Sequence, residues 1–294
     1  MQTANLKAIG RMLLGVLLFS FMDAGLKRIS AFYPPMQVTA LRAISSLPFI
    51  LLTLAWGNHW RALRVHNYTL YVVRIALAIV MLVTFIYAVS VQGLTDTYAI
   101  YMSAPLVVAA LSRIFLKEPV PVRRWLAIVI GMLGVLIALQ PHGRGFLSLG
   151  GLAAAASALC YAISVLSIRV LGRTDSSYAL VTWNLFGVAL VASVLAAPSW
   201  QSLAPDHVWI LAVIGITGAL AQYFLTRAFQ LAAAATVTPF EYTALVWGLM
   251  LDYFVFSIAP SPHVLIGATI VIAGGLYLIW DEHRPAKSEL SLRS

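Results

Sequence analysis

The chain has 294 residues, of which 61% are hydrophobic and only 10% are charged, and its mean hydropathy is +0.91. A soluble protein of this length needs a far more polar surface, so this composition excludes a soluble globular protein. The net charge of +9 does not indicate nucleic-acid binding, because the basic residues lie in short loops between apolar segments. The composition predicts an all-α integral membrane protein with almost no soluble part.

Ten apolar segments, each about 17–24 residues long, match the length that a helix needs to cross a hydrocarbon core of roughly 30 Å. In chain order they cover residues 8–29, 36–56, 68–91, 96–116, 124–140, 146–168, 178–197, 207–229, 237–257 and 263–280. Lys7 and Arg11 precede the first segment, as they would in a signal peptide, but no Ala-x-Ala cleavage site follows. We therefore expect the first segment to be retained as a membrane anchor.

Lysine and arginine residues predict the orientation of these helices. If the N-terminus is cytoplasmic, the basic residues at cytoplasmic ends are Lys7, Arg11, Arg61, Arg64, Lys117, Arg123, Arg124, Arg169, Arg173, Arg227, Arg284, Lys287 and Arg293. Only Lys27, Arg28 and Arg144 then lie at outer ends. This asymmetry follows the positive-inside rule and predicts that both termini are cytoplasmic.

The ten segments divide into two sets of five, over residues 1–140 and 141–294, within a single membrane domain. Because five is odd, the two sets would cross the bilayer in opposite orientations, which is the plan of many secondary transporters. Superposing residues 97–137 on 237–277 gives identities close to chance, but a tight turn before the fourth segment matches one before the ninth. We therefore expect ten transmembrane helices as two inverted five-helix repeats around a central cavity.

Both sets end in motifs of a known family. Residues 104–105 read Ala-Pro, residues 116–119 read Leu-Lys-Glu-Pro, and residues 131–135 read Gly-Met-Leu-Gly-Val. The second set ends with Ile-Gly-Ala at 266–268 and Ala-Gly-Gly-Leu at 273–276. With its ten-segment layout, the chain resembles the drug/metabolite transporter superfamily of the EamA type over nearly its whole length.

Within that superfamily the chain is most similar to the bacterial exporters of aromatic and other amino acids. The resemblance implies export of amino acids by alternating access and a location in the bacterial inner membrane. The chain departs from the pattern at residues 256–260, which read Phe-Ser-Ile-Ala-Pro where a second Leu-x-Glu turn is expected.

Aromatic and polar side chains within the spans are candidates for binding a small molecule with a hydrophobic body and a polar head. The candidate substrate-binding residues are Tyr98, Tyr101, Met102, Tyr87, Trp183, Asn184, Gln222, Tyr242 and Glu241, with Tyr161 and Tyr223 as further rings. The alternative is that many of these rings pack between helices or face lipid. Pro105 and Pro239 interrupt helical hydrogen bonding and are candidate hinges.

Ionisable groups in hydrocarbon need a partner, a wet cavity or a function. Asp23 and Lys27 lie four residues apart and are expected to pair on one helix face, or else to contact substrate as a polar gate. Arg42 either lines the transport path or snorkels to the interface. Glu241 is expected either to pair with Arg227 or to face the cavity.

Small residues recur at helical spacing in three places. They are Ala154, Ala158 and Ala162, then Ala127 and Gly131, and finally Gly215 and Gly218. Such stripes let helices approach closely in lipid, so they predict packing surfaces rather than binding sites.

These features favour a secondary transporter that exports amino acids, aromatic ones included, from the cytoplasm. The sequence has no nucleotide-binding glycine-rich loop, so ATP-driven transport by this chain alone is excluded. A broad drug or metabolite exporter of the same fold is the alternative. A membrane-embedded transferase would need His, Asp or Glu clustered at one membrane face, and the sequence shows no such cluster.

The expected partners are therefore a small-molecule substrate and the lipid bilayer, without nucleic acid or an obligate protein partner. Cys160 is the single cysteine and no two histidines lie four residues apart, so we expect no metal, cofactor or enzyme activity. Because the mid-membrane carboxylates have expected basic partners, facilitated flux is as well supported as proton coupling.

Overall fold

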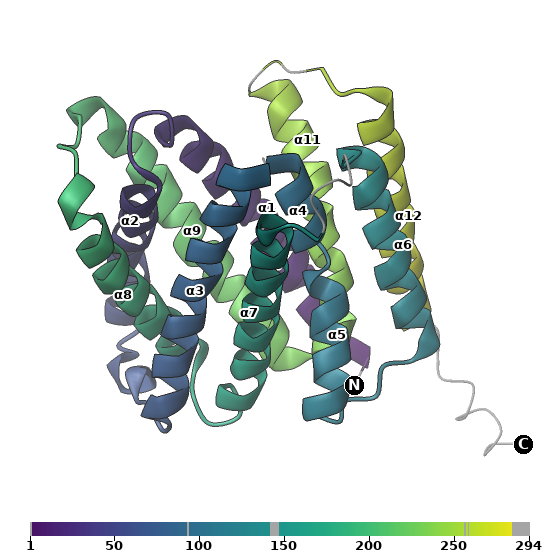
Figure 1. Cartoon of the computed structure of the whole chain (residues 1–294). Helices are drawn as coiled ribbons and strands as arrows, with labels where there is room; N and C mark the ends of the chain where they lie inside the picture. The colour runs from purple at the N-terminus through teal and green to yellow at the C-terminus, as the bar shows by residue number, and fades with distance from the viewer. Residues whose placement is uncertain (1, 93, 142–146, 256, 258, 284–294) are drawn as a thin grey trace, which may run out of the picture.

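The computed structural model describes residues 2–92, 94–141, 147–255, 257 and 259–283. All regular elements within these ranges are helices, and they pack side by side into one bundle (Figure 1). The predicted all-α architecture is confirmed.

The longer helices coincide with the predicted spans to within a few residues. In chain order the helices are α1 (Gln2–Ile29), α2 (Pro35–Trp56), η1 (Trp60–Leu63), α3 (Tyr68–Gln92), α4 (Leu94–Tyr101), α5 (Ala104–Phe115), α6 (Val122–Leu139), α7 (Leu149–Leu171), α8 (Ser177–Ala196), η2 (Ala197–Ser199), η3 (Pro205–His207), α9 (Val208–Leu231), α10 (Ala234–Val237), η4 (Thr238–Thr243), α11 (Ala244–Phe254) and α12 (Pro262–His283). The η elements are short 3-10 helices. Serine side chains cap the N-termini of α7 and α8. The hydroxyl oxygens of Ser148 and Ser176 each accept a hydrogen bond from a backbone N–H in the first turn of the helix that follows.

Nine helical segments within the described ranges are long and apolar enough to cross a membrane. The predicted span 237–257 is not among them, because it is divided into α10, η4 and α11. Its longest piece, α11, has only 11 residues. Proline explains the interruption: Pro239 has no N–H to continue the α-helical hydrogen bonds.

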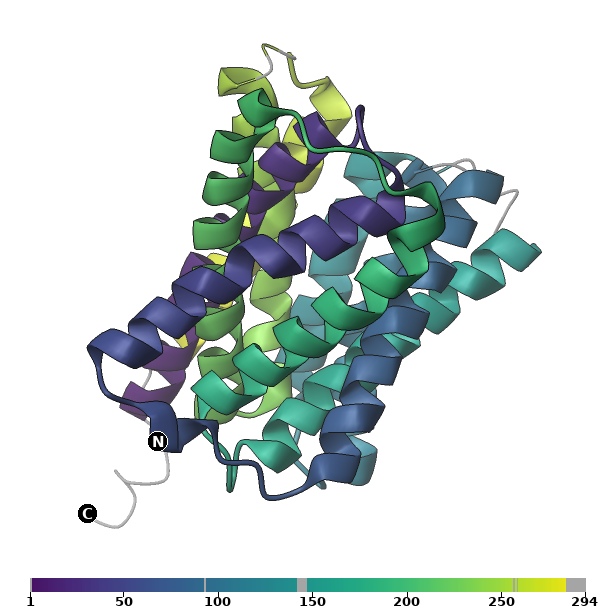
Figure 2. The same ribbon diagram turned by 90° about the vertical axis from the view of Figure 1, so that its left-hand side faces the viewer.

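Helices of the first half of the chain pack against helices of the second half. The most extensive pairs are α1 with α9, α3 with α7, α6 with α12, and α2 with α8. Figure 2 shows α2 and α8 side by side on one face, and Figure 1 shows α6 beside α12 at the edge. The two halves are thus interleaved in one membrane bundle rather than separated into two domains.

The small-residue stripes lie at these contacts, as predicted. Ala154, Ala158 and Ala162 of α7 are each at most 1% exposed. At the contact between α6 and α12, a Cβ added at Gly267 would lie 2.3 Å from the Gly134 carbonyl oxygen. Only glycine allows the two backbones to meet there.

Polar contacts bring the two ends of the described chain together. The Asn5 side chain on α1 donates to Glu282 Oε2 on α12 at 3.0 Å, and Arg124 at the start of α6 donates to Glu282 Oε1 at 2.6 Å. We call this the N-terminal end of the bundle; the opposite end holds the last turn of α1, with Lys27 and Arg28.

The variant Gly267→Ala is expected to destabilise the protein, because its methyl group would overlap the Gly134 carbonyl and overpacking costs about 1–3 kcal/mol. The midpoint of thermal unfolding in detergent, followed by tryptophan fluorescence, should fall by several degrees. Gly274→Ala on the same helix is the matched control, since its Cβ would meet only Ile130 Cγ2, at 3.8 Å. Equal midpoints for the two variants would contradict this packing.

Candidate functional site

Two spans are broken inside the bundle, one in each half of the chain. The first break separates α4 from α5, with Pro105 in the first turn of α5. The second is η4, with Pro239 near its start, between α10 and α11. Irregular backbone at membrane depth is tolerated only where protein or water satisfies its polar groups, so such breaks mark candidate binding sites. Both candidate hinge prolines therefore lie at breaks.

Glu241 lies on the second break with its carboxylate inside the bundle. Its Oε2 accepts a hydrogen bond of 2.8 Å from the Tyr161 hydroxyl on α7, and its Oε1 has no hydrogen-bond partner within the described residues. The expected pair with Arg227 is not formed, because Arg227 lies on α9 close to Tyr178 of α8. Glu241 is thus a buried carboxylate that a tyrosine, rather than a cation, contacts.

A second set of charged groups comes from α1 and α2. Asp23 interacts electrostatically with Arg42, and Arg42 in turn with Tyr101 of α4. Arg42 therefore faces the interior instead of snorkelling. The expected Asp23–Lys27 pair is wrong: Lys27 Nζ donates to Asp252 Oδ1 on α11 at 2.9 Å. Asp252 was missed because helical spacing indicates only same-helix partners.

Aromatic rings connect these charged groups. The Phe85 ring of α3 meets both Tyr98 and Tyr101 edge-on, with centroids 5.3 Å apart in each case. The centroid of the Tyr101 ring lies 6.0 Å from the centroid of the Tyr161 ring. The Tyr161 hydroxyl in turn donates the hydrogen bond to Glu241. We define the central cluster as Asp23, Arg42, Tyr98, Tyr101, Tyr161 and Glu241. Five elements (α1, α2, α4, α7 and η4) contribute to it.

Two of the candidate aromatic residues lie on the outer surface instead. Tyr87 follows Phe85 by two residues on α3, so its side chain points about 200° away from that of Phe85 around the helix axis. Tyr87 is 46% exposed. Trp183 is 38% exposed, and its indole N–H donates to the Leu63 carbonyl in the α2–α3 connection at 3.0 Å. Neither ring reaches the central cluster.

Three further candidates pack elsewhere. Tyr242 is 1% exposed and packs against Gly131 of α6, and Met102 belongs to the same apolar group. Gln222 is half-buried on α9 beside Tyr223, which lines a separate pocket of about 630 Å³ between α2, α8 and α9. These residues support the helix contacts around the cluster.

Arg74 is a functional candidate that the sequence interpretation left aside. It is 2% exposed on α3, and its Nε donates to Asn184 Oδ1 on α8 at 3.3 Å. One of its terminal nitrogens has no hydrogen-bond partner within the described ranges, and it interacts electrostatically with Tyr161. Asn184 therefore meets Arg74 next to the cluster. The signal that would have found Arg74 is an arginine in the middle of an apolar span.

The exposed part of the central cluster lies toward the opposite end of the bundle, four residues before Lys27 on α1 in the case of Asp23. Helices surround Asp23 and Tyr98, yet both remain solvent-accessible. The Lys27 and Asp252 side chains above them are 52% and 47% exposed. Toward the N-terminal end, in contrast, α1, α7 and α9 close over an apolar core that includes Met12, Leu171 and Phe229, each at most 2% exposed.

Polar contacts also close the N-terminal end. Glu118, in the turn between α5 and α6, accepts hydrogen bonds from Arg169 of α7, from Ser112 Oγ at 2.6 Å and from the Ala234 N–H at 3.1 Å. Burial raises the pKa of Glu118, but the hydrogen bonds from Ser112 and Arg169 outweigh this effect and hold it below its ordinary value. Arg169 also donates to the Phe229 carbonyl at 3.0 Å. These bonds connect the α5–α6 turn with α7, α9 and α10.

Two known transporters are similar in sequence to this chain over most of its length. A riboflavin transporter of Brucella anthropi is 33% identical over 225 residues, which are 74% of this chain and 79% of that protein. An S-adenosylmethionine uptake transporter of Rickettsia felis is 25% identical over 286 residues, 95% of this chain and 94% of that protein.

A solved crystal structure shares the fold, with a TM-score of 0.81 over 94% of this chain and 99% of the other, at 17% identity. The sequence model of the EamA-like transporter family matches residues 6–140 and again residues 148–280. The two matches together cover nearly the whole bundle. The chain therefore belongs to the EamA-like transporter family, and it is a multi-pass membrane protein of that family.

Proposed function

We propose that this chain is a secondary transporter that binds a small metabolite in the central cluster and moves it by alternating access. The observation that carries the proposal is the cluster itself, in which tyrosine rings and fixed charges meet beside two broken spans. Tyrosine faces suit a planar ring. Asp23, Arg42 and Glu241 supply the few polar contacts that orient a ligand in an apolar site.

Riboflavin is the leading candidate substrate and S-adenosylmethionine the next. Relatives that cover most of this chain carry these names, and both molecules combine a planar heterocycle with a polar chain. Export of amino acids, as expected from the sequence, is kept as a third candidate. It is favoured by the proximity of Asp23 and Arg42, which offer an anion and a cation to an ammonium and a carboxylate group.

We further propose two inverted repeats with both termini in the cytoplasm of a bacterial cell. Two matches to one family sequence model support the repeat. The helix pairs also support it, because exchanging the halves converts the α1–α9 pair into the α7–α3 pair and leaves α2–α8 and α6–α12 unchanged. With this orientation the structure is open to the outside and closed to the cytoplasm.

Counterflow is the direct test of substrate. Proteoliposomes loaded with unlabelled riboflavin should accumulate labelled riboflavin from a trace outside. Tyr101→Ala should raise the half-saturating concentration about tenfold, because an aromatic contact contributes about 0.5–1.5 kcal/mol and 1.4 kcal/mol is a factor of ten. Tyr87→Ala is the matched control from the outer surface and should change it less than about twofold, as expected for a site away from the ligand.

Three outcomes would change the proposed substrate or contradict the proposed binding site. Counterflow of S-adenosylmethionine or tryptophan, but not riboflavin, would select one of the other candidates. Counterflow of a cationic dye such as ethidium alone would support a broad drug exporter instead. Equal losses in Tyr101→Ala and Tyr87→Ala would show that the central cluster does not bind the ligand.

Glu241 changes the expectation for energy coupling. The sequence supports facilitated flux as well as proton coupling only on the premise that the mid-membrane carboxylates pair with bases, and Glu241 has a tyrosine partner instead. An intramembrane carboxylate without a cation is the type of group that proton-coupled carriers use. In this proposal Glu241 takes up a proton from the outer side and releases it to the cytoplasm.

A pH gradient across the liposome, acidic outside, is therefore expected to stimulate riboflavin uptake several-fold. Glu241→Gln should abolish this stimulation, whatever its effect on the rate without a gradient, because glutamine cannot exchange the proton. Asp206→Asn, an exposed carboxylate at the opposite end, is the control and should retain it. Stimulation that survives in Glu241→Gln would assign coupling to another group or to none.

A further inference from the structure

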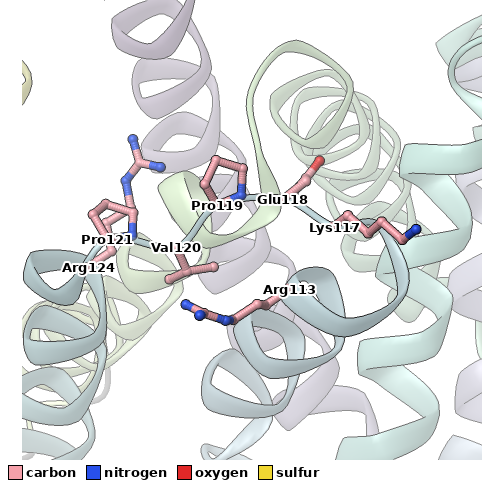
Figure 3. Close-up of a pocket in the computed structure, with 7 residues that line it drawn as sticks. All are labelled: Arg113, Lys117, Glu118, Pro119, Val120, Pro121 and Arg124. Atoms are coloured by element: carbon pink, nitrogen blue, oxygen red, sulfur yellow. The ribbon is translucent and has the colours of Figure 1, made fainter.

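A second site lies at the turn between α5 and α6. It is a pocket of about 640 Å³ (Figure 3), separate from the central cluster. Its lining residues are Arg113, Lys117, Glu118, Pro119, Val120, Pro121 and Arg124. In Figure 3 the Arg113 side chain extends beneath Val120 toward the start of α6, while Lys117 lies on the other side of the turn. The pocket is at the N-terminal end, where most basic residues gather.

The pocket carries positive charge that its own residues do not neutralise. Its one carboxylate, Glu118, is occupied by Arg169, Ser112 and the Ala234 N–H. Its third cation, Arg124, is paired with Glu282 of α12 at 2.6 Å. Arg113 and Lys117 are exposed, and in the part of the chain described here neither has a hydrogen bond or an ion pair from its side chain. The site therefore suits an anion.

Apolar side chains next to the pocket identify the kind of anion. Ile114 and Phe115, at the end of α5, are 66% and 71% exposed, and Val122, at the start of α6, is 72% exposed. In a membrane these side chains would contact acyl chains, and the long Arg113 and Lys117 side chains would extend from the same turn to the headgroups. Basic pockets between helix ends on the cytoplasmic side are suited to acidic headgroups. A free phosphate ion has no apolar part that could contact these exposed apolar side chains, whereas a phospholipid has acyl chains.

We propose that this pocket binds the headgroup of one anionic phospholipid of the inner leaflet. Because Glu118 of the same turn bonds Arg169 and Ala234, a lipid bound here would also hold the α5–α6 turn against α7 and α10. The lipid would thus stabilise the state in which the N-terminal end is closed. The site is separate from the substrate site, but its assignment to the inner leaflet rests on the proposed orientation, in which the N-terminal end faces the cytoplasm.

Native mass spectrometry of the detergent-solubilised protein, titrated with phosphatidylglycerol or phosphatidylcholine, tests the proposal. Phosphatidylglycerol should bind at about tenfold lower concentration, since each basic residue near a headgroup favours an anionic lipid. The double variant Arg113→Gln/Lys117→Gln should lose this preference. The matched control is Arg61→Gln/Arg64→Gln, two exposed cations of the α2–α3 connection outside the pocket, and it should keep the preference.

Further variants and measurements test whether the pocket binds a lipid headgroup specifically. Arg113→Lys/Lys117→Arg keeps both charges and should keep the preference, which separates loss of charge from misfolding. Phosphatidylglycerol should also raise the unfolding midpoint of the wild type but not of Arg113→Gln/Lys117→Gln. Equal weakening in the two glutamine double variants would reduce the site to general surface charge. Displacement of phosphatidylglycerol by millimolar inorganic phosphate would show a free-anion site, and either result overturns the proposal.

Discussion

The need to satisfy every backbone polar group inside hydrocarbon is the constraint on which this structure depends. Unbroken helices meet it automatically, and most of the bundle consists of them. Within the described residues, the transmembrane helices are interrupted at two places, at Pro105 and in η4, and both interruptions adjoin the central cluster. Polar side chains and solvent access are available at that point, so the irregular backbone and the candidate site require one another.

The two ends of the bundle differ in how they are held. At the closed end, an apolar core and the bonds of Glu118 join elements from both halves of the chain. At the open end, the Lys27–Asp252 pair is about half exposed, and exposed ion pairs stabilise a structure by only about 0–1 kcal/mol. In the proposed alternating access these arrangements would be exchanged, and the bonds of Glu118 to Arg169 and Ala234 are among those that would have to break to open the N-terminal end.

Span positions and packing stripes were predictable because length, hydropathy and small-residue spacing are local properties. The interruption at Pro239 was foreseen as a hinge, but not as a change to a 3-10 helix, which depends on surrounding contacts. The pairs Asp23–Lys27 and Glu241–Arg227 were wrong, because the groups that act on Asp23 and Glu241 come from other spans. Tyr87 and Trp183 could not be assigned to a face, since these helices are apolar all round and sequence period does not orient them.

The central claim is that the cluster between the broken spans holds the substrate, and a ligand-bound structure tests it most directly. Electron cryomicroscopy of the protein in lipid nanodiscs with saturating riboflavin should show the planar ring against Tyr98 and Tyr101, with Arg42 within hydrogen-bonding reach. Riboflavin bound instead in the aromatic pocket between α2, α8 and α9, with the central cluster empty, would contradict the account.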